Sequence, residues 1–200
     1  PLQKGSVQTM ATKDEKGKIT AQTRNTITGI TGSKNAFAVA YQSEFLDEKG
    51  KPTKTNSGDP LIINYSTVVK DGFMYVDMKG AFGAIEGLDD MEISGTAQKL
   101  PSTMSVGQKI DDASMKVKIA FMTCTSIMTE GQVVAEETVT VPAGTFKCFK
   151  VSQKVKTTAM GIKVDGVTYT WYAKGVGTVK TESYDAKGKF VSAQELIANN

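Results

Sequence analysis

Short segments in which apolar and polar residues alternate recur along the whole chain, and they predict a protein built almost entirely of β-strands. These segments are rich in Thr, Val, Ile, Phe and Tyr, and Gly, Asp and Asn separate them. The connections are short, which favours antiparallel neighbours. We expect a single all-β domain (residues 1–200), a long antiparallel meander with little helix. Its strands, about twelve, are expected at residues 6–12, 18–30, 36–45, 61–69, 73–79, 91–97, 115–128, 132–141, 145–155, 167–173, 177–184 and 190–197.

Three connections share the form D-x-K-G-K, at residues 14–18, 47–51 and 185–189. The Asp side chain can accept hydrogen bonds from the backbone of such a turn, and the Gly can adopt a positive φ. The motif therefore predicts hairpins, and it is a turn signal rather than a binding motif.

Two stretches interrupt the strand pattern. Residues 80–90 are the best helical segment, but three glycines among eleven residues favour a loop or a single turn. Residues 100–110 form the longest gap between predicted strands, so we expect them to cross from one part of the sheet to another.

Charge and hydropathy restrict the classes of partner. The chain has 24 basic and 21 acidic residues, a net charge of +3, which is too small an excess to indicate nucleic-acid binding. No apolar run approaches the ~20 residues of a transmembrane helix. The chain begins at Pro1 rather than Met, which indicates that an upstream segment was removed, whether a signal peptide or not.

Catalytic equipment is sparse, and we expect no enzyme, no metal site and no cofactor. The absence of histidine removes Ser-His-Asp and Cys-His arrangements and most zinc sites. Acidic pairs occur at residues 89–90, 111–112 and 136–137. Adjacent residues of a strand point to opposite faces, so Glu136 and Glu137 cannot act on one atom together. A hydrolase built on carboxylates is the weakest alternative.

The two cysteines, Cys124 and Cys148, could form one disulfide or remain free. The predicted strand order places a third strand between them, at a separation of roughly 9–10 Å, which is too far for a disulfide. We therefore expect two reduced, partly buried thiols.

Methionines and aromatic residues supply the candidate binding surface. Nine methionines suit a deformable apolar groove, and Tyr169 and Trp171 share one face of a predicted strand. The alternative for each of them is ordinary core packing. The candidate ligand contacts are Met74, Met78, Met122, Tyr169 and Trp171.

Two motifs carry a family resemblance: V-P-A-G-T-F-x-C at residues 141–148 and W-Y-x-x-G-x-G-x-V at residues 171–179. With Leu100-Pro101 and residues 106–108, they resemble a family of uncharacterised secreted or lipoprotein β-domains of Gram-negative bacteria. The resemblance implies an exported protein that is periplasmic or at the cell surface, with or without a lipid anchor. It also implies an antiparallel sheet that curls into a barrel or half-barrel. Pro142 and Gly144 also explain the first motif structurally, as the end of a strand and a turn.

These observations favour a non-enzymatic cell-envelope protein that binds a small apolar ligand or a lipid on the concave face of a curved sheet. The alternative is a structural or interaction module that contacts an envelope protein or a glycan through hairpin tips or an edge strand.

Overall fold

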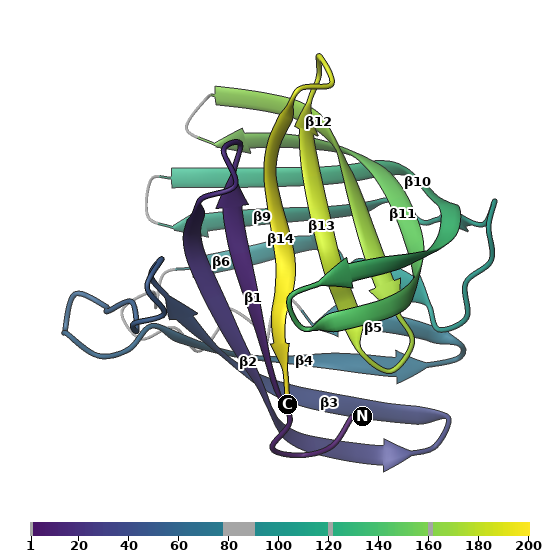
Figure 1. Cartoon of the computed structure of the whole chain (residues 1–200), viewed down its shortest axis with the longest axis horizontal. Coiled ribbons are helices and arrows are strands. Elements are labelled where there is room, and N and C mark those ends of the chain that lie inside the picture. Colours follow the sequence, from purple (N-terminus) through teal and green to yellow (C-terminus); the bar gives the residue numbers. More distant parts are fainter. Residues whose placement is uncertain (1, 78–90, 120–121, 160–161) are drawn as a thin grey trace.

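The computed structural model describes residues 2–77, 91–119, 122–159 and 162–200. Their strands form one antiparallel sheet of 14 members, in the order β6-β9-β10-β11-β12-β13-β14-β1-β2-β3-β4-β5-β7, with β8 paired to β10 (Figure 1). No helix occurs among the described residues. The strands are β1 (Val7–Asp14), β2 (Ile19–Ser33), β3 (Ala36–Leu46), β4 (Ile62–Lys70), β5 (Phe73–Asp77), β6 (Met91–Thr96), β7 (Lys99–Pro101), β8 (Lys109–Ile110), β9 (Ala113–Ile119), β10 (Met122–Val141), β11 (Gly144–Ala159), β12 (Ile162–Ala173), β13 (Gly177–Asp185) and β14 (Phe190–Asn199).

The sheet curls until its two ends approach each other. β6 and β7 follow one another in the chain but occupy opposite ends of the strand order, and only Ala97 and Gln98 join them. Three residue steps from Thr96 to Lys99 span at most about 11 Å. The expected curled meander is therefore confirmed, as an open barrel in which no described strand pair closes the ring.

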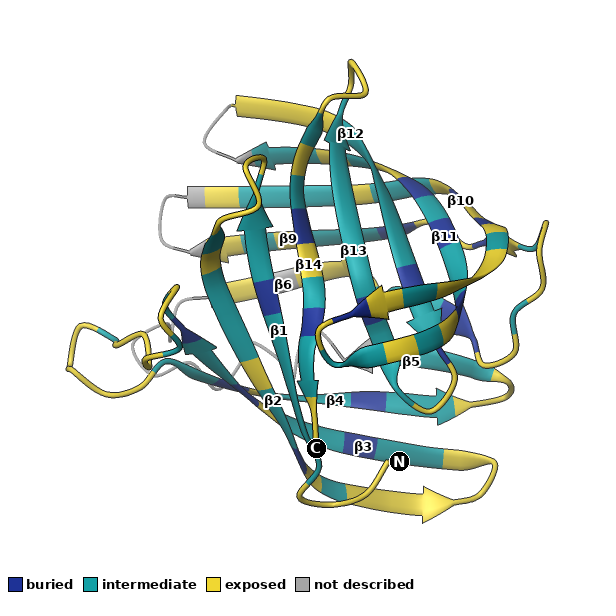
Figure 2. Ribbon diagram, viewed as in Figure 1, coloured by how far each residue is buried: buried dark blue, intermediate teal, exposed yellow. Residues whose placement is uncertain are grey.

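Burial follows the strand pattern. Figure 2 shows buried residues in the middle of the strands and exposed ones toward the hairpin ends. One buried cluster, Leu100, Ile110, Val133 and Val151, joins β7 and β8 to β10 and β11. Because β7 and β11 lie far apart in the strand order, these side chains can meet only across the inside of the curl. The face of the sheet that carries Val151 is therefore the concave face.

All three D-x-K-G-K segments are tight turns. Two of them form hairpins as predicted, joining β1 to β2 and β13 to β14, whereas the turn at residues 47–51 leads from β3 to an isolated bridge between Leu46 and Pro52. In each, one Asp Oδ1 accepts hydrogen bonds of 2.8–2.9 Å from the backbone N–H groups two and four residues later. Gly17, Gly50 and Gly188 each have a φ of 77°. The hydrogen bond from the backbone N–H of Lys51 is the largest cause that lowers the pKa of Asp47; desolvation opposes it, and the hydrogen bond from Lys49 N–H adds to the lowering.

Two strand boundaries differ from the prediction. Residues 115–128, expected as one strand, span the end of β9 and the start of β10, which pair with Ile119 opposite Met122. β10 then continues through the break expected before residue 132. Glu130 there adopts a φ of 53° within a β-bulge, so the Glu130-Gly131 pair bends the strand without ending it. The segment 80–90 lies outside the described residues.

The segment from residue 100 to 110 does connect distant parts of the sheet, as expected. It begins in β7, which pairs with β5, and ends in β8, which pairs with β10. The sequence pattern missed both short strands because neither is long enough to show alternation.

The tip of the β10–β11 hairpin forms a second layer. Residues 137–148, here called the hairpin flap, lie in front of β13 in Figure 1. The backbone N–H of Ala143 donates to the carbonyl of Leu196 on β14, 3.2 Å away. β10 ends at Val141 and β11 begins at Gly144, so Pro142 and Gly144 terminate and turn the chain as predicted.

Candidate functional site

A strip of apolar side chains on the concave face is the first candidate for a ligand surface. β11 and β12 pair without irregularity from Cys148 opposite Ala173 to Ala159 opposite Ile162. Ile162 and Val164 therefore lie on the same face as Tyr172, which packs against the concave core cluster. The members of this concave strip, linked by cross-strand pairing, are Met115, Val117, Cys124, Met128, Val155, Ile162 and Val164.

The outer end of the concave strip is open to solvent. Ile162 is 68% exposed and Val164 is 58% exposed, although both belong to a strand. Toward the other end, Val151 and Tyr172 are part of the packed interior, and burial raises the pKa of Tyr172 to about 12. The strip therefore runs from a packed floor to an apolar surface that has no covering segment among the described residues.

The residues predicted as ligand contacts do not come together. Met74 packs against the concave cluster through Leu100, its partner on β7. Tyr169 and Trp171 lie on the opposite, convex face, because they alternate with Tyr172 along β12. Met78 and the side chain of Met122 lie outside the described residues. Tyr169 and Trp171 therefore lie on a different face from Met74, and ligand contact by these residues stays a prediction.

Trp171 is a core anchor beneath the hairpin flap. It is 5% exposed and packs with Val141, Cys148 and Ala173. Its indole N–H donates to Glu137 Oε1 at 2.5 Å, which ties the flap to β12. The core alternative described above therefore holds for Trp171.

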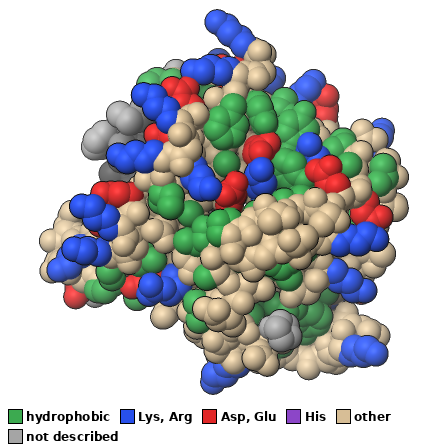
Figure 3. Space-filling model, viewed as in Figure 1, with side chains coloured by type: hydrophobic (Ala, Val, Ile, Leu, Met, Phe, Trp, Pro, Cys, Tyr) green, Lys and Arg blue, Asp and Glu red, His purple; other side chains and the backbone are tan. Residues whose placement is uncertain are grey.

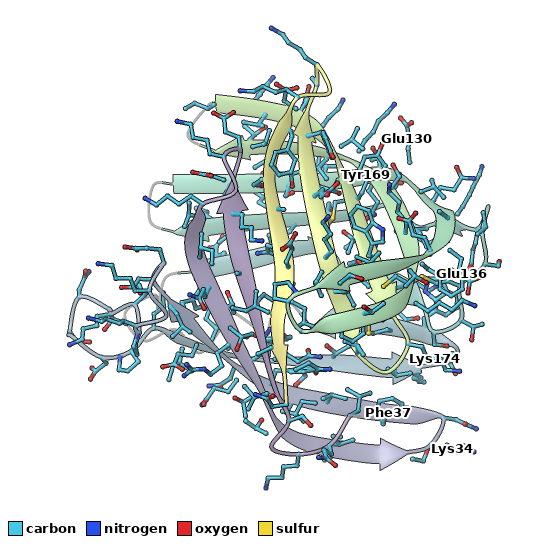
Figure 4. All side chains as sticks on the ribbon, in the orientation of Figure 1. Lys34, Phe37, Glu130, Glu136, Tyr169 and Lys174 are labelled. Atoms are coloured by element: carbon cyan, nitrogen blue, oxygen red, sulfur yellow. The ribbon has the colours of Figure 1, made fainter. Side chains whose placement is uncertain are left out.

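A groove on the convex face is the second candidate surface. Its volume is about 670 Å³, and it lies over β11, β12 and β13 beside the turn at residues 185–188. Figure 3 shows hydrophobic side chains together with Lys, Asp and Glu on the same face of the molecule, and Figure 4 labels Tyr169 and Glu130 there. The groove is lined by Lys150, Lys154, Val155, Lys156, Asp165, Gly166, Val167, Tyr169, Glu182, Tyr184, Asp185, Ala186 and Gly188.

Aromatic rings form the apolar part of this groove. The rings of Tyr169 and Tyr184 meet edge to face at 5.7 Å, and Phe190 meets Tyr184 at the same distance. The ammonium of Lys150 lies 4.6 Å from the ring centroid of Tyr169 and 4.7 Å from that of Trp171. These are cation–π distances.

The acidic side chains of the groove are largely engaged. Burial would raise the pKa of Glu182, but hydrogen bonds from Lys180 at 2.7 Å and Tyr184 at 2.8 Å, with the charge of Lys150, lower it overall. Asp185 accepts the two backbone hydrogen bonds of its turn.

The acidic pairs considered above have separate partners. Glu136 binds Lys147 at 2.8 Å, whereas Glu137 binds Trp171 on the other face. Asp111 lies 3.6 Å from Lys99. The pair at residues 89–90 is outside the described residues. No three potential metal-binding side chains gather within the described part of the chain.

The cysteines are free, but for a different reason from the one expected. Cys124 and Cys148 lie on directly neighbouring strands, so no third strand separates them. Cys124 pairs with Ala159 and Cys148 with Glu137, which places them at opposite ends of the β10–β11 hairpin. Burial, and then the charge of Glu137, raises the pKa of the Cys148 thiol.

The sequence pattern missed the exposed members of the concave strip. Ile162 and Val164 precede the strand expected from residue 167. Ile162 and Val164 alternate with Lys163 and Asp165, which is a strand signal. Extending the predicted strand back to residue 162 on this signal would have included both residues.

The fold defines a class: a protein with one antiparallel sheet curled into an open barrel and a β10–β11 hairpin folded over its convex face. The chain belongs to the DUF3108-like family, whose model matches residues 3–196. This result agrees with the expected all-β family, although it does not test the two motifs individually. The described residues contain no helix long and apolar enough to cross a membrane.

Two solved structures share the fold over the whole chain. A candidate exported protein with a YmcC-like fold from Bacteroides fragilis is 21% identical, with a TM-score of 0.80, and the match covers 100% of this chain and 97% of that one. A candidate lipoprotein from Parabacteroides distasonis is 20% identical, with a TM-score of 0.79 and the same coverage. At this identity the likeness shows the fold alone. The comparison with curated proteins finds no match.

Proposed function

We propose that the protein is a non-enzymatic component of the bacterial cell envelope that binds a small apolar ligand or a lipid on the concave strip. The observation that carries the proposal is the exposure of Ile162 and Val164 on the concave face, in register with further apolar side chains on β9–β11. Exposed apolar patches of this kind are typical of interaction surfaces. The names of the two structural neighbours, one exported and one a lipoprotein, support the compartment.

Covering these side chains supplies the binding energy. Full burial of a Val or Ile side chain contributes roughly 1.5–3 kcal/mol. Because Ile162 and Val164 are already partly covered, we expect about 1 kcal/mol from each when a ligand covers the rest. Thr157 and Ser126, which are hydrogen-bonded to each other at 3.3 Å, lie on the same face and leave few free polar groups to oppose an apolar ligand.

Native mass spectrometry tests the proposal. The protein, purified without detergent, is incubated with a lipid extract of a Gram-negative envelope and measured for added mass. Val164→Glu and Ile162→Glu place a charge on the strip, so we expect at least a tenfold loss of the bound form. Val106→Glu is the matched control, because Val106 has the same 58% exposure as Val164 and lies in the loop between β7 and β8.

The three variants should melt at temperatures close to that of the wild type, because all three side chains are exposed. A wild-type protein that stays at its bare polypeptide mass would refute the proposal, as would equal binding by Val164→Glu and Val106→Glu. Either result would favour the interaction module, whose hairpin tips would then be the surfaces to test.

A further inference from the structure

The convex groove has a composition different from that of the concave strip. Its centre is aromatic, and three lysines of β11 stand along one wall, at positions 150, 154 and 156. Even-numbered residues of β11 share one face, so all three ammonium groups belong to the convex side. The groove is therefore an apolar surface with a basic wall.

The three lysines of this wall differ in their interaction partners. Lys154 forms an ion pair with Glu130 at 2.7 Å. Lys150 and Lys156 form no ion pair with any described residue. The ammonium of Lys150 is held instead by the rings of Tyr169 and Trp171, which attract a cation but accept no conventional hydrogen bond.

The carboxylates nearby form no ion pair with Lys150 among the described residues, although its charge helps to lower the pKa of Glu182. Glu182 is bound by Lys180 and Tyr184, and Asp185 is occupied by its turn. Asp165 lies opposite Lys156 on β12, at the far end of the wall. The N–H donors of Lys150 are therefore available to a ligand, directly beside the half-buried ring of Tyr169 and the buried ring of Trp171.

We infer that this convex groove is a second binding site, which takes a small amphipathic anion. The apolar or ring-shaped body lies against Tyr169 and Tyr184, and a carboxylate or phosphate group is bound by Lys150. A volume of about 670 Å³ falls within the range of small-molecule sites, about 300–1,000 Å³. The inference is independent of the exposed end of the concave strip, because Ile162 and Val164 lie on the opposite face of the sheet from Lys150 and Tyr169; Val155 is the one residue common to the strip and the groove lining.

Calorimetric titration with three probes that share one ring system tests the site. Naphthoate and naphthyl phosphate carry the two acid groups, and naphthalenemethanol is the neutral analogue. We expect both anions to bind the full chain at low salt and the neutral analogue to bind at least about tenfold more weakly, a difference of about 1.4 kcal/mol. A preference for one anion assigns the acid group of the ligand and supports the proposal in either case.

Variants locate the site. Lys150→Gln should remove the preference for the anions, and Lys150→Arg should keep it, which separates loss of charge from loss of fold. Lys116→Gln is the control, because Lys116 is an exposed lysine of β9, outside the groove, that has no ion pair among the described residues. Ile162→Glu, on the concave face, should leave the affinity for naphthoate unchanged.

Four results would overturn the proposal: binding of none of the probes, equal affinity for the neutral analogue, unchanged anion affinity in Lys150→Gln, or loss of naphthoate binding in Ile162→Glu. The last result would place the probe on the concave strip.

Discussion

The hydrogen bond between Glu137 and Trp171 should hold the hairpin flap against β12, and its contribution can be worked out from the structure. The donor belongs to a side chain that is 5% exposed, whereas the Glu137 side chain is exposed to solvent. A hydrogen bond to a charged group contributes about 1.5–3 kcal/mol in general. Water can reach the indole N–H in part once Glu137 is removed, so we expect Glu137→Ala to lower the free energy of unfolding by about 1 kcal/mol.

For a chain of this size, 1 kcal/mol corresponds to a Tm lower by roughly 2–4 °C. Glu137→Gln retains an acceptor oxygen and should cost less than Glu137→Ala. Glu137→Gln also removes the charge that contributes to the raised pKa of the Cys148 thiol. The pH dependence of Cys148 alkylation in the folded protein should therefore shift to lower pH. This second readout distinguishes the charge from the hydrogen bond.

The neighbouring carboxylate is the matched control. Glu136 forms an exposed ion pair with Lys147, and such pairs contribute about 0–1 kcal/mol. A double-mutant cycle by urea denaturation should give a coupling energy of about 1 kcal/mol between Glu137→Ala and Trp171→Phe, and none between Glu136→Ala and Trp171→Phe. Equal coupling in the two cycles would refute the assignment of Glu137 as the anchor of the flap.

Three further predictions concern the sheet and its turns. Gly166→Ala should destabilise the protein by about 1–3 kcal/mol in urea denaturation, because the new Cβ would lie 2.2 Å from a carbonyl oxygen of β13; Gly29→Ala, which has nothing within 4 Å, is the control and should have little effect. The pKa of Asp47 is lower in the folded state, so the ionised carboxylate stabilises the fold above the ordinary pKa of 3.8, and this stabilisation is lost as the pH falls through the lowered pKa. The difference in Tm between wild type and Asp47→Asn should therefore be constant near neutral pH and become smaller in acid. A difference in Tm that does not depend on pH would contradict the turn contacts of Asp47. Iodoacetamide should modify the partly exposed Cys124 well before the buried Cys148 in the native protein, as mass spectrometry of timed samples would show, and equal rates would exclude the packing of Cys148 under the flap.

Sequence alternation and turn chemistry predicted most of the fold because each depends on neighbouring residues alone. Asp14 and Gly17 specify a tight turn, as do the same residue types at the same spacing in the other two D-x-K-G-K segments, and Pro142 ends a strand for a similarly local reason. The errors arose where tertiary contacts decide. Glu130-Gly131 resembles a turn in sequence but is a bulge within β10, where Gly131 pairs with Ile110 of β8 and a Cβ at Gly131 would lie 2.7 Å from the Ile110 Cβ.

The candidate site was predictable only in part, because residue types do not show to which side a sheet curls. Tyr169 and Met74 both suit an apolar surface, but the curvature places them on opposite faces. Lys150 had no sequence signal at all: its position over two rings follows from the pairing of β11 with β12, with Lys150 directly opposite Trp171.

The position of β1 has a consequence for how the protein reaches its native state. β1 pairs with β14, so that Gln8 lies opposite Asn199 in the middle of the strand order (Figure 1). The contacts with the greatest sequence separation therefore hold the centre of the sheet rather than its edge. Proteins dominated by such non-local pairing fold slowly, because the entropic cost of closing a long loop must be met before the contacts form. The two halves of the meander can form early and locally, but they become one sheet only when β14 is available to pair with β1. During synthesis, completion of the sheet must therefore await emergence of residues 190–199 from the ribosome.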